Sequence, residues 1–293
     1  MIVTGAGRGI GREEALLFAA EGAKVVVNDL GMSAFDGSGE QQPVAQEVVD
    51  AIKAMGGEAI ANRDDVSDWE GAQRLINSAI ETYGKLDTLV NNAGILRDRM
   101  LVNMTEEEWD AVIKVHLKGT FAPTRWAAAY WRELAKAGNP LEARVVNTSS
   151  SSGLYANPGQ TNYGAAKSGI ATFTQIAAKE LKNYGIKVNA IAPGARTRMT
   201  ENLMAARGRP EPKPEEFDRS SPANVAPLVV WLGSSACEVS GQTFNVAGGS
   251  VGVAESWGRG PTEDKGDRWE PSELTDVVPK LVEQARPGTS IGG

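Results

Sequence analysis

The sequence predicts an α/β fold: a doubly wound, seven-stranded parallel sheet of the Rossmann kind, forming a single domain with a C-terminal tail. Three observations predict it. Short apolar stretches alternate with amphipathic segments whose apolar residues fall at helical spacing. A glycine-rich turn follows the first apolar stretch, and polar clusters follow several later ones. Ligands bind at the carboxyl edge of such a sheet, so these clusters predict a site there.

The composition of the 293-residue chain limits its function. Hydrophobic residues make up 41% and charged residues 23%, which is ample for a buried core. The net charge of -7 argues against nucleic-acid or membrane-surface binding. One cysteine, Cys237, and one histidine, His116, exclude an internal disulfide and a metal site rich in either residue. Without a membrane-spanning run, a signal peptide or a peroxisomal signal, we expect a cytoplasmic protein.

The chain opens with a strand over residues 1–4, a glycine turn, and a helix over residues 12–21. This order aims backbone N–H groups and the positive end of a helix at a pyrophosphate. Alone, such a turn could equally be a tight connection. The strand is short for its place, so we expect a few native residues before it. The turn residues expected to bind a dinucleotide are Gly5, Arg8, Gly9, Ile10 and Gly11.

The second strand, residues 23–27, runs into Asp29. Asp29 lies 18 residues after Gly11, where an acidic side chain can bind the adenosine ribose hydroxyls. A carboxylate there repels the 2′-phosphate of NADP, so it favours NAD as the cofactor. Arg8 would instead favour NADP, since a base in the glycine turn could meet that phosphate. A long polar loop, residues 31–43, follows.

The third strand, residues 59–62, follows a helix over residues 44–55 and leads into three residues of interest. The carboxylate of Asp65 and the backbone amide of Val66 could read the adenine edge of a dinucleotide. Asp64 could equally cap the helix that comes next. Both readings remain open from the sequence.

The fourth strand, residues 86–90, follows a helix over residues 68–83 and ends in an amide-rich turn. Small and amide residues let a flat ring approach the backbone. A helix with a capping-box start then covers residues 105–131 and contains His116. A lone histidine in a helix is more often structural than functional. The turn residues expected beside the cofactor are Asn92, Ala93 and Gly94.

A Tyr/Lys pair follows the fifth strand, residues 143–146. Tyr163 and Lys167 stand four residues apart in a predicted helix that reaches Tyr184, so they share one face. An ammonium one turn from a phenol favours the phenolate, so we expect it to lower the tyrosine pKa from about 10. Tyr163 would then carry protons near neutral pH. The pair alone is weak evidence, because helix surfaces produce it by chance.

The last part of the chain completes the sheet and then changes in composition. A strand over residues 187–192, a helix over residues 225–234 and a strand over residues 242–246 close the domain, which we place at residues 1–253. Residues 254–293 are rich in glycine, proline and charge, with one predicted helix. We expect this extension to cover the substrate cleft or a subunit interface.

Several independent motifs flank the predicted strands: Thr4-Gly5-x-x-x-Gly9-x-Gly11, Asn91-Asn92-Ala93-Gly94, Ser150 thirteen residues before Tyr163, Tyr163-x-x-x-Lys167, and Pro193-Gly194. Together they resemble the motifs of the short-chain dehydrogenase/reductase family over roughly residues 2–249. The resemblance implies the strand order 3-2-1-4-5-6-7. It also implies hydride transfer between a nicotinamide and a carbonyl or alcohol carbon.

The resemblance implies a role for each matching residue. Tyr163 corresponds to the proton donor and acceptor, and Lys167 to the residue that holds the nicotinamide ribose and lowers the tyrosine pKa. Ser150, selected from four serines by its spacing to Tyr163, would hydrogen-bond the substrate oxygen. Thr197 comes one residue earlier than the family pattern. The implied cofactor contacts are Asn92, Ala93 and Gly94 at the adenosine ribose, and Pro193, Gly194, Ala195 and Thr197 at the nicotinamide.

His116 stands where the family has its fourth catalytic residue, an asparagine. A narrower resemblance rests on Val27-Asn-Asp-Leu-Gly31 with its long loop, Asn91-Asn-Ala-Gly-Ile-Leu-Arg-Asp-Arg99 and Val115-His-Leu-Lys-Gly119. These segments are similar to the (3R)-hydroxyacyl-CoA dehydrogenase units of multifunctional β-oxidation enzymes, which were also named for 17β-hydroxysteroid dehydrogenase activity. A histidine is usual at this position in that subgroup, so the resemblance places His116 among the catalytic residues.

The sequence therefore predicts an NAD-dependent dehydrogenase that oxidises (3R)-3-hydroxyacyl-CoA or catalyses the reverse. The alternatives are a 17β-hydroxysteroid or other secondary-alcohol dehydrogenase, and a dinucleotide-binding regulator without catalysis. The resemblance implies a homodimer or homotetramer formed through the long helices. Basic residues that could receive the phosphates of CoA, or simply lie in a solvated loop, are Arg196, Arg198, Arg207, Arg209 and Lys213.

Overall fold

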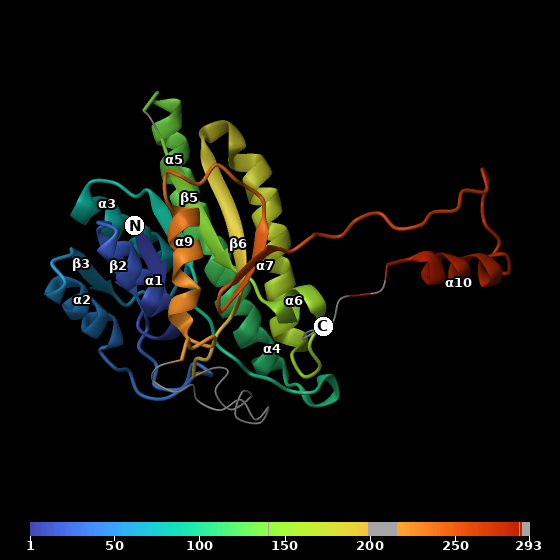
Figure 1. The fold of residues 1–293 in the computed structure, drawn as a ribbon, viewed down its shortest axis with the longest axis horizontal. Coiled ribbons are helices and arrows are strands. Elements are labelled where there is room, and N and C mark those ends of the chain that lie inside the picture. Colours follow the sequence, from blue (N-terminus) through green and yellow to red (C-terminus); the bar gives the residue numbers. More distant parts are fainter. Residues whose placement is uncertain (140, 199–215, 287, 289–293) are drawn as a thin grey trace. The chain divides into compact units, whose positions relative to one another are not determined.

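The computed structural model describes residues 1–139, 141–198, 216–286 and 288. An eight-stranded sheet forms its centre, in the order β3-β2-β1-β4-β5-β6-β7-β8 (Figure 1). Strands β1 to β7 pair in parallel, which confirms the predicted doubly wound fold and strand order. The strands are β1 (Ile2–Thr4), β2 (Val25–Asn28), β3 (Ala59–Asn62), β4 (Thr88–Asn91), β5 (Ala143–Thr148), β6 (Ile186–Gly194), β7 (Thr243–Ala247) and β8 (Ser250–Val253).

Strand β8, which the sequence did not predict, pairs antiparallel with β7 at the edge of the sheet. All of its residues are exposed, and Gly252 interrupts its short apolar pattern. A half-buried strand is recognised by alternating apolar residues, and β8 lacks the buried half of that pattern. It was missed for this reason.

Helices cover both faces of the sheet because successive strand side chains point to opposite sides. Val3, Val27 and Val90 pack on one face with α1, α2 and α9 (Figure 1). Ile2 and Val26 pack on the other face with α3, α5 and α7. The helices are α1 (Gly9–Ala20), α2 (Val44–Ala54), α3 (Trp69–Tyr83), α4 (Glu106–Ile113), α5 (Gly119–Lys136), α6 (Ser151–Tyr155), α7 (Thr161–Leu181), α9 (Ala226–Gly233) and α10 (Leu274–Gln284).

The predicted helix over residues 105–131 has a break in its geometry. Its capping box is present, with Thr105 and Glu108 each accepting a hydrogen bond from the other's backbone amide. Between α4 and α5, however, the segment Lys114–Lys118 forms one π-helical turn, η2. Single π turns inside helices are rare and occur often at functional sites. This one contains His116.

The chain divides into two compact units, Met1–Ala254 and Glu255–Gly293. The second unit contains α10, whose Val278 and Val282 side chains are exposed. Before it, the Lys265 ammonium lies 2.5 Å from a Glu273 carboxylate oxygen and over the ring of Trp269. Among the described residues, no helix combines the length and apolar character needed to cross a membrane.

Glu14 is a titratable carboxyl buried inside the core of the first unit. It lies on the buried face of α1 and has no exposed surface. Neither of its carboxylate oxygens has a hydrogen-bond partner within the part of the chain that the structure describes. Removal from water disfavours the ionised form, which raises the pKa of Glu14 to about 8.

Glu14 is expected to make the protein less stable as the pH rises. Between the unfolded value of 4.5 and the folded value of about 8, only the folded state keeps the proton. The free energy of unfolding therefore falls across this window, by up to about 5 kcal/mol. Glu14→Gln should remove this slope in urea denaturation at pH 5 and pH 8. Glu13→Gln on the same helix should retain it, and a slope unchanged in Glu14→Gln would contradict the assignment.

Candidate active site

The sequence-predicted site residues gather at the carboxyl edge of the sheet. The turns after β1, β2, β3, β4 and β5 and the end of β6 carry the strand-end residues, whereas α7 and η2 carry the other three. This edge is where ligands bind in open parallel sheets. The turns after β1, β2 and β4 contact one another directly, as described below.

The glycine turn after β1 packs directly on the turn after β4. A Cβ atom at Gly11 would lie 2.4 Å from both the Asn92 Nδ2 atom and the Gly5 oxygen, so only glycine fits. The Asn92 amide donates hydrogen bonds to the Thr4 and Gly5 carbonyls. Helix α1 begins at Gly9 directly after this turn. Its free N–H groups and positive end are suited to a phosphate.

Asp29 closes the other side of the glycine turn. Its carboxylate accepts hydrogen bonds from the backbone amides of Gly7 (2.9 Å) and Gly31 (2.7 Å). Arg8 points away into the loop over residues 31–43, where it donates to the Met32 carbonyl at 3.2 Å and contacts Gln42. The acid, rather than the base, is thus fixed beside the backbone of the glycine turn.

The polar side chains of the turn after β3 bond to residues close to them in the sequence. The Asp65 carboxylate accepts from the Ser67 amide (2.8 Å) and hydroxyl (2.6 Å), and Val66 is buried. Asp64 pairs with Arg74 at 2.7 Å and does not cap the next helix. That cap is Asp68, which accepts from the Gly71 amide, so the alternative that gave the cap to Asp64 is wrong.

Ser150 lies beside Tyr163, where its hydroxyl favours the phenolate by hydrogen bonding. Ser150 caps the short helix α6, and its Oγ atom accepts from the Ser152 amide at 3.1 Å. Burial raises the pKa of Tyr163 to about 12, the Ser150 hydrogen bond works against the rise, and Asp98 adds to it. This direction is opposite to the one expected from the Tyr/Lys pair.

The buried environment of Lys167 explains why its charge does not lower the pKa of Tyr163. Its side chain is buried, with Nζ donating to the Thr148 carbonyl at 2.5 Å and lying 5.5 Å from the centre of the Tyr163 ring. Burial lowers the pKa of Lys167 itself to about 7. Desolvation thus weakens the charge of both partners, and it outweighs their attraction.

His116 completes the cluster from the opposite side. Its ring meets the Tyr163 ring edge-on, with 5.1 Å between the centroids, and its Nε2 atom lies 2.7 Å from the Ile95 carbonyl oxygen. Burial and the nearby Lys167 charge hold the His116 pKa well below 6.5, so the ring is neutral. The Nδ1 atom is buried and has no hydrogen-bond partner within the described residues.

Two more predicted segments border the cluster. Gly94 packs flat against His116, and the end of β6 supplies Pro193 and Gly194. Beyond that strand Ala195 is buried, and the Thr197 methyl carbon lies 3.3 Å from where a Cβ of Gly9 would be. The loop after β6 therefore stands against the glycine turn.

The predicted basic patch is only partly described. Arg196 pairs with Asp218 at 3.1 Å, and Arg198 donates to the Ser33 carbonyl. Both guanidinium groups therefore already have protein partners. Arg207, Arg209 and Lys213 lie outside the described residues.

Two polar residues that hold the cluster together, Gln160 and Asn162, were not predicted as site residues from the sequence. Gln160 donates to Asp98 at 2.7 Å, and Asn162 donates to the carbonyls of Arg97 (3.0 Å) and Glu108 (3.1 Å). Asn162 is fully buried and Gln160 nearly so. A single sequence reveals neither contact, because polar residues before a helix usually read as turn or cap.

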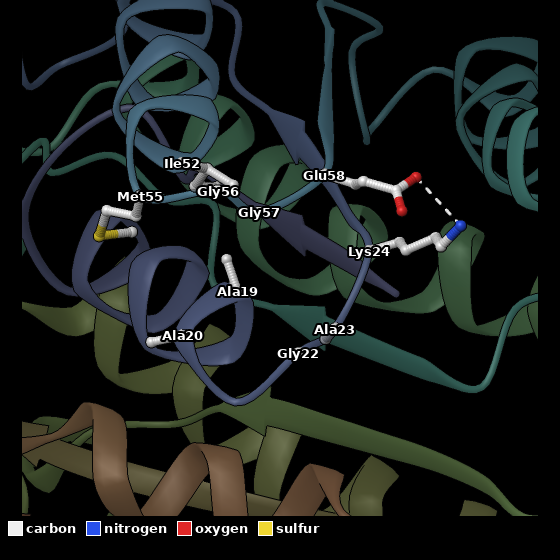
Figure 2. Close-up of a pocket in the computed structure, with 10 residues that line it drawn as sticks. All are labelled: Ala19, Ala20, Gly22, Ala23, Lys24, Ile52, Met55, Gly56, Gly57 and Glu58. Carbon is white, nitrogen blue, oxygen red and sulfur yellow. Dashed lines mark ion pairs between the residues drawn. The ribbon is translucent and has the colours of Figure 1, made fainter.

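A hollow of about 320 Å³ lies elsewhere, between the ends of α1 and α2 (Figure 2). The Lys24–Glu58 ion pair flanks it, and both residues directly precede strands. It therefore lies at the amino ends of β2 and β3, opposite the candidate site. Among the described residues, no group of three or more acidic, histidine or cysteine side chains is arranged to hold a metal ion.

The family model described as short chain dehydrogenase matches residues 1–208. The chain belongs to this family. Its members are oxidoreductases that act on CH–OH groups of small molecules and generally use NAD or NADP. The chain is thus a short-chain dehydrogenase.

Two named proteins and one crystal structure are similar to this chain over most of its length. Hydroxyacyl-CoA dehydrogenase ChsB1 of Mycobacterium tuberculosis is 47% identical over 285 residues, which cover 94% of this chain and 86% of that protein. The peroxisomal multifunctional enzyme type 2 of Mus musculus is 44% identical over 86% of this chain but only 32% of its own length. The crystal structure of a short chain dehydrogenase from Mycobacterium avium superposes with a TM-score of 0.87 and 55% identity, covering 99% of this chain and 96% of that one.

Gly94→Ala should damage the site of this short-chain dehydrogenase without removing a polar group. The added Cβ would lie 2.3 Å from His116 Cε1, so the ring must shift from its place against Tyr163. Displacement of this size should lower kcat about tenfold or more. Gly252→Ala, where no atom lies within 4 Å of the new Cβ, is the control. Equal kcat values for the two variants would show that the His116 position does not matter.

Proposed function

We propose that the protein oxidises (3R)-3-hydroxyacyl-CoA to 3-ketoacyl-CoA with NAD, or catalyses the reverse reaction. The hydrogen-bonded Ser150–Tyr163 pair, with Lys167 and His116 against it, is the observation that carries this proposal. The substrate class is supported by the relative named hydroxyacyl-CoA dehydrogenase, which covers nearly the whole chain.

Each side chain of the cluster has a proposed role that depends on how readily it binds or releases a proton. Ser150 donates a hydrogen bond to the substrate oxygen, and Tyr163 accepts the alcohol proton as that oxygen becomes a carbonyl. NAD held at the glycine turn would supply the hydride acceptor. Lys167, when protonated, favours the phenolate form of Tyr163. His116 is neutral and keeps the buried wall beside the phenol uncharged.

Asp29 supports NAD over NADP. Its two oxygens are already fixed by backbone amides, so the carboxylate cannot turn away from a ribose placed over the glycine turn. A 2′-phosphate would meet a fixed negative charge. The adenosine end would be bordered by Asn92, Ala93, Asp65 and Val66, and the nicotinamide end by Pro193 to Thr197.

A homodimer or homotetramer is part of the proposal. The outer faces of α5 and α7 expose Phe121 and Ile176, which are 42% and 51% accessible. Exposed large apolar side chains of this kind support an interface. Size-exclusion chromatography with light scattering would distinguish the two assemblies from a monomer.

Tyr163→Phe should lower kcat for NADH formation by roughly 10²- to 10⁴-fold, because the general base is lost. Tyr184→Phe, distant from the cluster, is the matched control. In the wild type, kcat for oxidation should rise with pH, since the pKa of Tyr163 lies above neutrality. Full activity in Tyr163→Phe would favour a dinucleotide-binding regulator over an enzyme.

The substrate is tested by NADH absorbance with (3R)- and (3S)-3-hydroxyacyl-CoA and a 17β-hydroxysteroid, each with NAD and with NADP. The proposal expects turnover of the (3R) isomer with NAD. Turnover of the (3S) isomer alone, of the steroid alone, or with NADP alone would each contradict it.

Asp29→Asn should weaken the preference for NAD. Removal of the carboxylate charge removes its repulsion of a 2′-phosphate, so the ratio of kcat/KM for NADP to that for NAD should rise about tenfold or more. Asp50→Asn, a surface change on α2, should leave the ratio as it is. A ratio unchanged in Asp29→Asn would assign cofactor choice to another residue.

A further inference from the structure

Five consecutive residues after β4, Ile95 to Arg99, are tied to three other parts of the site. The Ile95 carbonyl meets His116 at 2.7 Å, and the Leu96 amide donates to Phe35 in the loop over residues 31–43 at 3.2 Å. The remaining ties run to the segment that opens α7: Asn162 to the Arg97 carbonyl, Gln160 to the Asp98 carboxylate, and the Arg99 amide to the Gly159 carbonyl at 2.8 Å.

Gln160 is the residue where these ties converge on the catalytic serine. Its Nε2 atom donates to Asp98 at 2.7 Å, and its Oε1 atom accepts from the Ser152 hydroxyl (2.7 Å) and from Asn157 (2.8 Å). The Ser152 amide in turn donates to the Ser150 Oγ atom at 3.1 Å. Hydrogen bonds thus link Asp98 to Gln160 and Gln160 to the Ser152 hydroxyl, and Ser152 passes the constraint through its own backbone to the Ser150 Oγ atom.

Burial and hydrogen bonds fix the orientation of the Gln160 side chain. The residue is only 9% exposed and immediately precedes α7, three positions before Tyr163. Both of its polar atoms are occupied, and a flip of the amide would turn its Oε1 atom toward the Asp98 carboxylate and lose that hydrogen bond. Asn162 fixes the same helix start by accepting from the Tyr163 amide at 2.7 Å.

We propose that Gln160 is a positioning residue, which holds Ser150 against Tyr163 through Ser152 and takes its own orientation from Asp98. The inference rests on the proposed catalytic roles of Ser150 and Tyr163. Through Asp98 and Gln160, the turn after β4, which borders the site, would thus control the position of the Ser150 hydroxyl.

The position of Ser150 also bears on the proton affinity of Tyr163. The Ser150 hydrogen bond favours the phenolate, so a misplaced serine should make Tyr163 harder to ionise. The other groups facing the tyrosine are Lys167 on α7, neutral His116 on η2 and Asp98 after β4. On α4, Glu108 is paired with Arg99 at 2.9 Å.

The test uses the full chain with (3R)-3-hydroxybutyryl-CoA and NAD. Gln160→Leu, which keeps the shape and removes both polar atoms, should lower kcat about tenfold. The midpoint of its kcat–pH profile should move to higher pH by roughly half a unit. Gln46→Leu is the matched control, because Gln46 makes the same kind of bond, to Asp50 at 2.8 Å, on the exposed surface of α2.

A double-mutant cycle separates this chain of bonds from general damage. Asp98→Ala alone should lower kcat severalfold through the loss of the Gln160 orientation. In the Gln160→Leu background it should lower kcat no further, because only its direct effect on the Tyr163 pKa, which favours the phenolate, remains. If the kcat losses of the two single variants simply added in the double variant, the inference would be wrong. It would also be wrong if Gln160→Leu kept the wild-type kcat and the wild-type midpoint of the kcat–pH profile. If Gln160→Leu fails to fold by circular dichroism, Ser152→Ala replaces it with the same expectations.

Ser150→Ala distinguishes failure of this inference from failure of the proposed function. A loss of kcat in Ser150→Ala together with an unaffected Gln160→Leu overturns the positioning role alone. An unaffected Ser150→Ala overturns the catalytic role of Ser150, and the inference with it.

Discussion

The hydrogen bond from the Lys167 ammonium to the Thr148 carbonyl is the contact on which the site depends most. It fastens the buried face of α7 to the carboxyl end of β5, and so sets how far Tyr163 stands from Ser150. The carbonyl accepts a charged donor in a place that excludes water. Such a bond is strong when made, but a buried ammonium without a partner is costly. Together with the hydrogen bond from the Ser149 hydroxyl to the Lys167 carbonyl at 2.8 Å, it joins the end of β5 to α7 beside the candidate catalytic pair.

Desolvation dominates the electrostatics of this region. Lys167, Tyr163 and His116 all have pKa values shifted toward their neutral forms. Burial favours the neutral form of each of these three groups, most completely for Tyr163 and His116, while Lys167 with a pKa of about 7 can still carry its proton near neutral pH. Small changes in charge nearby therefore matter more here than they would at the surface. A clustering of shifted groups in one cleft is typical of sites that move protons.

Much of this arrangement could be predicted from the sequence, and the reasons are physical. Strand and helix periods identified seven parallel strands, and the rule that ligands bind at strand carboxyl ends located the turns that meet in the site. Spacing selected Ser150, which is hydrogen-bonded to Tyr163. The direction of the Tyr163 pKa was wrong, since proximity to Lys167 can be read from spacing whereas burial cannot. The Asp98–Gln160 contact joins residues 62 positions apart, and no local pattern encodes it.

The π-helical turn Lys114–Lys118 constrains how this chain can change over generations. A π turn holds one residue more than the α turn it replaces. Because the extra residue is absorbed within the turn, removing one residue there would leave an ordinary α turn with α4 and α5 still in register. Trp131 on α5, whose indole donates to the Leu86 carbonyl at 2.6 Å, could then keep its place in the core. The change would instead fall on His116, whose contact with the Ile95 carbonyl depends on the wider turn.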